Sequence, residues 1–109
     1  ATKSFDRAST IYELSPHMHY RGASSKFTLQ YPNGTSEIIL SVPAYFFDWQ
    51  ALYRFDTPKQ IPPGTRLICE GWFDNTAQNR YNPGPNDTVR FGEQSWEEMF
   101  IGYVNFVED

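Results

Sequence analysis

Residues 26–42 constrain the fold of this chain most, because they have the pattern of a β-hairpin. Residues 26–31 alternate polar and apolar side chains, and residues 37–42 are rich in aliphatic and β-branched side chains. Between them lies Pro32-Asn33-Gly34-Thr35, which contains the Asn-Gly pair typical of tight hairpin turns. We therefore predict two antiparallel strands joined by this turn.

Other segments have the composition of short strands, and none has the period of an amphipathic helix. Aromatic residues make up 17% of the chain, and such residues favour strands. The predicted strands are residues 5–14, ending at the Pro16 boundary, and residues 51–55, 66–73 and 99–107. Residues 95–98 have the form of a capping box, which predicts a single helical turn before the last strand.

Together these segments predict an all-β fold, an antiparallel β-sandwich of the jelly-roll type, in a single domain covering residues 1–109. In the last strand, Met99, Ile101 and Tyr103 should share one face. The opposite face should carry Phe100, Val104 and Phe106. Residues 74–87 form a long polar loop rich in Asn, Asp, Gly and Pro, for which we expect Asx-turns rather than a calcium site.

Charge and composition exclude some functions. The formal net charge is −4 and no cluster of Lys or Arg is present, so nucleic acid is not an expected partner. No apolar run approaches the ~18 residues of a membrane helix, so no membrane insertion is expected. The sequence opens with Ala1 rather than Met, which suggests a domain excised from a longer protein.

The two histidines of the chain, His17 and His19, are one residue apart. In an extended segment both rings point out of the same face while Met18 points to the other. Imidazole is a common ligand of zinc, copper, iron and nickel, so this pair is half of a potential metal site. The alternative is a pair of ordinary surface or hydrogen-bonded histidines.

The remaining donor is left open by this pattern. Met18 is excluded because it faces away from both histidines, which leaves Met99 as the only thioether, although a methionine at a strand start is often core filler. The other candidate donors are Cys69, Asp48, Asp74 and Glu98.

Two motifs carry a family resemblance: residues 16–22 (PHMHYRG) and residues 97–103 (EEMFIGY). In combination they resemble the C-terminal domain of the copper type II, ascorbate-dependent monooxygenases, the family of peptidylglycine α-hydroxylating monooxygenase and dopamine β-monooxygenase. Trp49-Gln50, Asp74-Asn75-Thr76 and Asn82-Pro83 resemble the bacterial branch of that family.

The resemblance implies one copper ion, cycling between Cu(I) and Cu(II), held by His17, His19 and Met99. It implies O₂ activation and hydroxylation of a C–H bond in an organic substrate, with electrons from ascorbate or another redox domain. It also implies a periplasmic or extracellular location. The donor set agrees with this metal, because a soft thioether favours Cu(I), whereas zinc sites rarely use methionine.

The chain also departs from the family. A third histidine is missing, so this chain cannot supply the three-histidine second copper centre, and alone it is at most half of a monooxygenase. Of the carboxylate clamp used by peptide-hydroxylating members, only Tyr103 matches, as a substrate-binding residue, while Ser15 and Ile101 replace its arginine and asparagine. Phe100 replaces a disulfide-forming cysteine of the animal enzymes, so Cys69 is interpreted as a buried free thiol.

Three functions therefore remain for test. The first is the oxygen-activating copper domain of a monooxygenase-like protein. The second uses the same copper site for storage, delivery or electron transfer without hydroxylation. The third is a sandwich that binds carbohydrate through exposed aromatic side chains, in which the histidines have no metal role.

Overall fold

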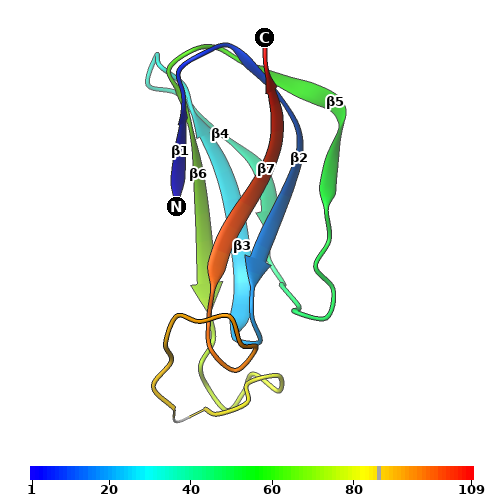
Figure 1. Ribbon diagram of the computed structural model, residues 1–109, viewed down its shortest axis with the longest axis vertical. Coiled ribbons are helices and arrows are strands. Elements are labelled where there is room, and N and C mark those ends of the chain that lie inside the picture. Colours follow the sequence, from blue (N-terminus) through cyan, green and yellow to red (C-terminus); the bar gives the residue numbers. More distant parts are fainter. Residues whose placement is uncertain (86) are drawn as a thin grey trace.

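A computed structural model describes residues 1–85 and 87–109, and Asn86 of the predicted polar loop lies outside the described residues. The described chain has seven strands and no helix, so none of its elements is a helix that could cross a membrane. The strands, labelled in Figure 1, are β1 (Thr2–Phe5), β2 (Ser9–Met18), β3 (Gly22–Gln30), β4 (Ser36–Val42), β5 (Tyr53–Ile61), β6 (Thr65–Phe73) and β7 (Phe100–Glu108).

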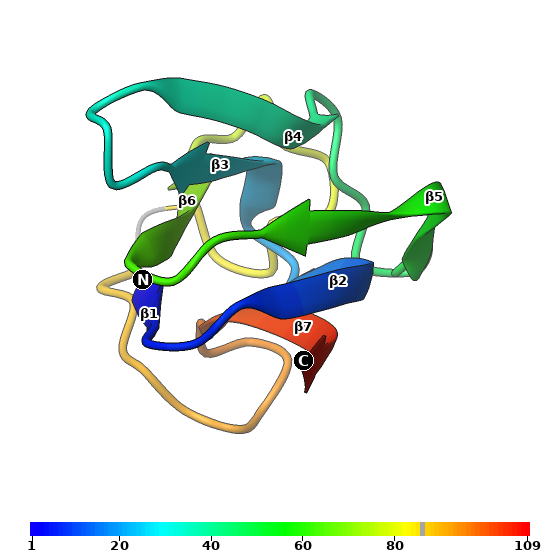
Figure 2. The same ribbon diagram turned by 90° about the horizontal axis from the view of Figure 1, so that it is seen from above.

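The strands form two antiparallel sheets that pack face to face. One sheet has the strand order β1-β6-β3-β4 and the other has the order β5-β2-β7. Figure 2, viewed along the long axis, shows the two layers. The predicted all-β antiparallel sandwich is confirmed, while its jelly-roll topology stays a prediction.

The core lies between the sheets and takes side chains from both. It includes Ile11 and Leu14 of β2 and Phe27 and Leu29 of β3, all 1% exposed or less. Phe100, Val104 and Phe106 pack against this region from β7, which confirms the inward face predicted for the last strand. Strand alternation therefore assigns an inner and an outer face to every element around the candidate site.

The predicted hairpin is confirmed by the pairing of β3 with β4. Gly34 has a φ of 90°, a conformation that glycine adopts without the steric penalty of a Cβ atom. Asn33 supports the same turn, since its Oδ1 accepts hydrogen bonds from the backbone N–H and the hydroxyl of Thr35.

The first predicted strand is wrong in its boundaries. Strand β1 ends at Phe5. Strand β2 starts at Ser9 and continues through Pro16 as far as Met18. Proline is tolerated there because β5 pairs with β2 only as far as Leu14, so beside Pro16 the strand has a partner on the β7 side alone. The continuation of β2 carries His17 to the very end of the sandwich.

The predicted strand at residues 51–55 is also misplaced, because β5 begins at Tyr53 and runs on to Ile61. The helical turn predicted at residues 95–98 is absent from the structure. Instead Glu98 forms an isolated bridge with Phe91, and the Glu97 side chain accepts a hydrogen bond from the backbone N–H of Gln94. The local bonds between Gln94 and Glu97 close a turn, and the bridge to Phe91 takes the place of a helical continuation.

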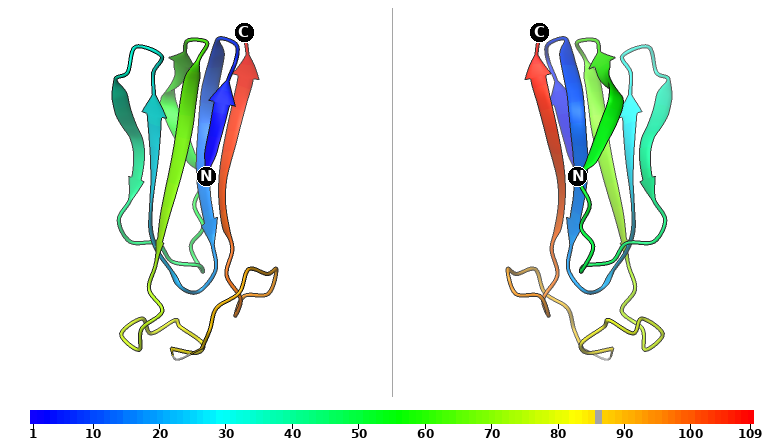
Figure 3. Two further views of the ribbon diagram at one scale, coloured as in Figure 1. Left: turned by 90° about the vertical axis from the view of Figure 1, so that its left-hand side faces the viewer. Right: turned by 90° about the vertical axis from the view of Figure 1, so that its right-hand side faces the viewer.

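The long loop between β6 and β7 lies beyond one end of the sheets, as Figure 3 shows from two sides. Its Asx-turns are as predicted: Asp74, Asn79 and Asn82 each accept a hydrogen bond from the backbone N–H two residues further on. These bonds satisfy the backbone N–H groups of Thr76, Tyr81 and Gly84 within the loop itself.

Cys69 is a free thiol, 5% exposed and packed in the core, as predicted. Burial raises the pKa of the thiol, because the thiolate would lose its hydration. At pH values above about 8.5, the ordinary thiol pKa, the native protein therefore keeps the Cys69 proton whereas the unfolded chain loses it. The stability that this group contributes is complete below about pH 8.5 and is lost as the pH rises from there through the raised pKa of the native thiol.

We expect Cys69 to react with iodoacetamide much more slowly in the native protein than in urea-unfolded protein, at about pH 8.5. The rate is measured by mass spectrometry against a cysteine-containing peptide of the same concentration. Native alkylation as fast as that of the free peptide would contradict the buried position.

Candidate metal centre

His17 and His19 lie at the end of β2, with His17 in its last residues and His19 directly after it. Met18 between them is fully buried between the sheets beside Val42 and Tyr45. The two histidines therefore lie on the outer face of the β5-β2-β7 sheet, as the strand alternation predicted. Their ring centroids are 5.2 Å apart and the ring planes are nearly perpendicular, at 86°.

The hydrogen bonds of both rings define which nitrogen carries the proton. His17 Nδ1 lies 2.6 Å from Gln50 Oε1, and His19 Nδ1 lies 3.2 Å from the carbonyl oxygen of Glu97. Gln50 presents its oxygen to His17 because its Nε2 donates to the carbonyl of Phe47. Both partner atoms are acceptors, so each Nδ1 donates, and in the neutral ring Nε2 then keeps its lone pair.

This tautomer is the one that metal-binding histidines adopt when a second group orients the ring. Two imidazoles bound to one ion through Nε2, with metal–nitrogen bonds of about 2.0 Å at a roughly tetrahedral angle, have their centroids about 5 Å apart. The observed separation of 5.2 Å fits that arrangement. The histidine pair is therefore compatible with a single metal ion.

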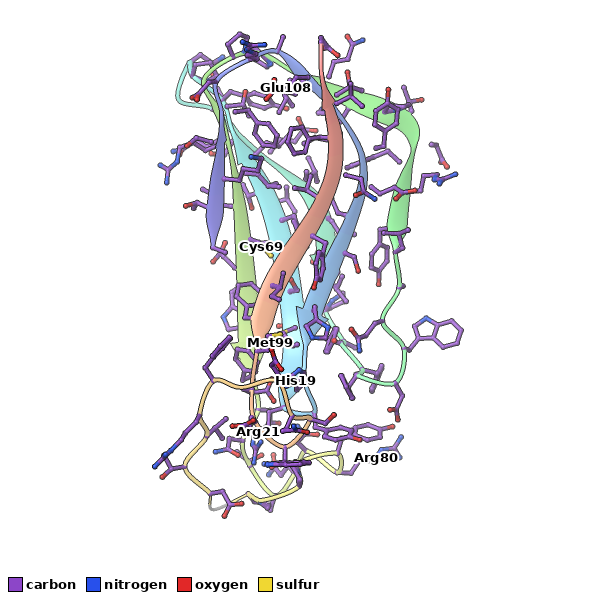
Figure 4. The ribbon with its side chains drawn as sticks, in the orientation of Figure 1. His19, Arg21, Cys69, Arg80, Met99 and Glu108 are labelled. Atoms are coloured by element: carbon purple, nitrogen blue, oxygen red, sulfur yellow. The ribbon has the colours of Figure 1, made fainter. Side chains whose placement is uncertain are left out.

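Met99 directly precedes β7 and belongs to the same region. The β2–β7 register ends at Met18↔Phe100, so Met99 lies next to the strand end that carries the histidines. Because the Phe100 side chain packs into the core, an extended backbone at Met99 has its side chain on the outer face, as the histidines do. Figure 4 shows labelled His19 and Met99 at the same end of the sandwich.

Two of the other donors considered from the sequence, Cys69 and Asp74, lie elsewhere or are already engaged. Cys69 belongs to the core between the two sheets, whereas the histidines lie on the outer face of the β5-β2-β7 sheet. Asp74 accepts hydrogen bonds from the backbone and hydroxyl of Thr76, which hold its pKa below the usual range. Within the described residues, no three His, Cys, Asp or Glu side chains form a group that could hold a metal. A third protein ligand beside the histidine pair would then come from another residue type, such as the thioether of Met99.

Tyr103 also lies on the outer face of this sheet and is 54% exposed. Its ring centroid is 6.4 Å from that of His17, and Ile101 pairs with His17 in the register. Tyr103 is thus placed beside the candidate site, in a position from which it can contact a bound molecule.

Several residues that shape the site were not predicted from the sequence. Gln50 was noted only as part of the resembling Trp49-Gln50 pair and was given no role. Phe47 packs edge-on against His19, with centroids 5.6 Å apart, and His19 is only 4% exposed. These contacts come from the irregular segment between β4 and β5, whose path has no periodic signal in the sequence.

Arg21 and Glu98 bind the His segment to the β6–β7 loop. The Arg21 side chain is 2% exposed and donates hydrogen bonds to Asn75 Oδ1 and to the carbonyl oxygens of Trp96 and Gly84. Its backbone N–H donates to Glu98 Oε2 at 3.0 Å. None of these four hydrogen bonds was expected from the sequence, since 54 to 77 positions separate the bonded residues.

Comparisons with known proteins add no relative: no family model, curated protein or solved structure matches this chain.

We expect Arg21→Ala to lower the free energy of unfolding by about 2–4 kcal/mol, because it removes three hydrogen bonds of a buried side chain and leaves the Trp96 carbonyl oxygen without its donor. Asn75 Oδ1 and the Gly84 carbonyl keep Asn82 and Asp87 as donors. Urea unfolding followed by circular dichroism measures the change. Arg80→Ala is the matched control: the Arg80 side chain is exposed, donates to the Tyr81 hydroxyl, and should change stability by about 0.5 kcal/mol or less. Equal effects of the two substitutions would show that the Arg21 contacts do not stabilise the loop.

Proposed function

We propose that this chain is the copper-binding domain of a monooxygenase-like protein, with His17, His19 and Met99 as the ligands of one copper ion. The observation that carries the proposal is the tautomer of the histidine pair. Hydrogen bonds to Gln50 and to the Glu97 carbonyl occupy both Nδ1 atoms, which leaves both Nε2 atoms for a metal. The resemblance in residues 16–22 and 97–103 supports the same ligands.

Copper suits this donor set better than zinc. Imidazole binds both oxidation states of copper, and the soft thioether of Met99 favours Cu(I), whereas zinc sites are built from Cys, His, Asp and Glu. Copper held here would supply one-electron redox chemistry and an open position for O₂.

The protein's own contribution is to orient the ligands and to control access. Gln50 and the Glu97 carbonyl fix the two rings, and the Phe47 ring covers one side of His19. His17 is more exposed and faces Tyr103, so this side of the site is the accessible one. We propose that an organic substrate approaches over Tyr103, on a surface without the arginine needed for a bidentate carboxylate clamp.

In this proposal the electrons come from ascorbate or from another redox domain, and the protein works in the periplasm or outside the cell. Only two histidines are present in the chain, which favours a second candidate when the domain acts alone: copper storage, delivery or electron transfer. Hydroxylated product formed by the intact parent protein with copper, ascorbate and O₂ separates the two candidates, because storage, delivery or electron transfer forms none.

The copper proposal predicts that the protein binds one equivalent of Cu(II) and that the bound Cu(II) gives a type 2 EPR signal. His17→Ala should lower the affinity by more than the 10–100-fold that loss of an outer partner costs, because it removes a direct ligand. Cys69→Ser is the control and should leave the affinity unchanged, since Cys69 lies in the core. If wild-type protein gives no type 2 signal, the copper proposal fails and the carbohydrate-binding alternative gains support.

Met99→Leu tests the thioether. We expect about a 10-fold or larger loss of Cu(I) affinity and a change in Cu(II) affinity of roughly 3-fold or less, because the soft ligand stabilises Cu(I) selectively. Competition with a Cu(I)-specific chelator measures the first value. Met18→Leu is the matched control, because Met18 lies between the same histidines but points into the core. Equal Cu(I) affinity in the two variants would remove Met99 from the ligand set.

A further inference from the structure

The Glu98 carboxylate lies where the β2–β7 ladder ends. Its Oε1 accepts the backbone N–H of His19 at 2.8 Å and lies 3.4 Å from the backbone nitrogen of Met99. Its Oε2 accepts the backbone N–H of Arg21 at 3.0 Å. The side chain is 9% exposed, so these bonds form away from bulk water.

This carboxylate replaces the last rungs of the ladder. The strand pairing stops at Met18↔Phe100, and beyond it the N–H groups of His19 and Met99 both turn to one oxygen atom of Glu98. All three donors are N–H groups, so both carboxylate oxygens act as acceptors. Hydrogen bonds from N–H groups to a carboxylate are stronger than those between neutral groups. A single side chain therefore couples the backbone of the histidine segment to the backbone of Met99.

The chain on either side of Glu98 is anchored as well. The carbonyl of Trp96 accepts a hydrogen bond from Arg21, and Glu98 exchanges backbone hydrogen bonds with Arg90 and Gly92. His17, by contrast, is oriented by Gln50, which belongs to the separate segment between β4 and β5. Loss of the Glu98 side-chain bonds should therefore release the backbone of His19 and Arg21 from this anchored segment and change the place of Met99 relative to His19, while His17 keeps its partner.

We propose that Glu98 is a positioning residue that sets the place of the Met99 thioether relative to His19, and through it the preference of the site for Cu(I) over Cu(II). This inference rests on the proposed copper site. Glu98 itself uses its oxygens on backbone N–H groups and is not a ligand. Its role follows from the position of one carboxylate between the segment that follows β2, with His19, and the segment that precedes β7, with Met99.

Glu98→Gln removes one acceptor at nearly constant shape, because the amide group offers one oxygen and one NH₂. We expect Cu(I) affinity to fall by about 10–100-fold, the usual cost of losing an outer partner, with a weaker copper–sulfur contribution in X-ray absorption. Cu(II) affinity, which depends mainly on the imidazoles, should change by roughly 3-fold or less.

Glu97→Gln is the matched control, since it makes the same change of charge one residue away. The Glu97 side chain accepts a hydrogen bond only from Gln94 among the described contacts, and its backbone carbonyl still serves His19. Its Cu(I) affinity should stay within about 2-fold of the wild-type value, below the 10-fold minimum expected for an outer partner. Metal-free protein gives an independent readout: amide hydrogen exchange at His19 and Arg21 should accelerate in Glu98→Gln and not in Glu97→Gln.

Glu98→Asp provides a second variant that keeps the negative charge but shortens the side chain by one methylene. It should show the same selective loss of Cu(I) affinity, because the shorter side chain cannot reach both segments. Retained Cu(I) affinity and copper–sulfur scattering in both Glu98 variants would overturn the positioning role while leaving the copper site intact. A wild-type protein that binds no copper would instead overturn the proposed function.

Discussion

The backbone pairing of β2 with β7 is the interaction on which the candidate site depends. It runs antiparallel over nearly the whole of both strands, from Ser9↔Glu108 to Met18↔Phe100. Because side chains alternate between faces, a register shift of one residue would turn the outer residues of either strand into the core. The burial of Met18 and Phe100 in a common cluster holds the register, and so the packing of the core determines which residues meet His19 on the outside.

The site also depends on segments without regular structure. Gln50 and Phe47 reach the histidines from the connection between β4 and β5, while Glu97 and Glu98 reach them from the β6–β7 loop. The buried Arg21 guanidinium joins this loop to the end of β2 through three hydrogen bonds. The sheets thus supply the face on which the histidines lie, and the two connections supply the groups that orient them. Irregular backbone satisfied in this way can hold a site in one geometry.

Much of the fold could be predicted from the sequence, because strands and turns leave local patterns. The Asn33-Gly34 turn, the Asx-turns of Asp74, Asn79 and Asn82, and the inward face of β7 all follow from such patterns. The errors fell where a distant partner outweighed a local signal. Pro16 continues a strand because β5 does not pair with it, and the capping-box pattern at residues 95–98 forms no helix because Glu98 bonds to the His segment.

By itself, the sequence determined the elements that repeat locally: an all-β chain, the common face of His17 and His19, and the opposite orientation of Met18. Alternation along a strand is a property of the backbone, so it needs no knowledge of the partner strands. Only the tertiary structure decided that the start of β7, beside Met99, pairs with the end of β2, that Gln50 and the Glu97 carbonyl present acceptors to the Nδ1 atoms of both rings, and that Glu98 joins the two segments. The hydrogen bonds among them join residues between 33 and 79 positions apart, and all of these contacts arise from the packing of the whole core rather than from any local pattern.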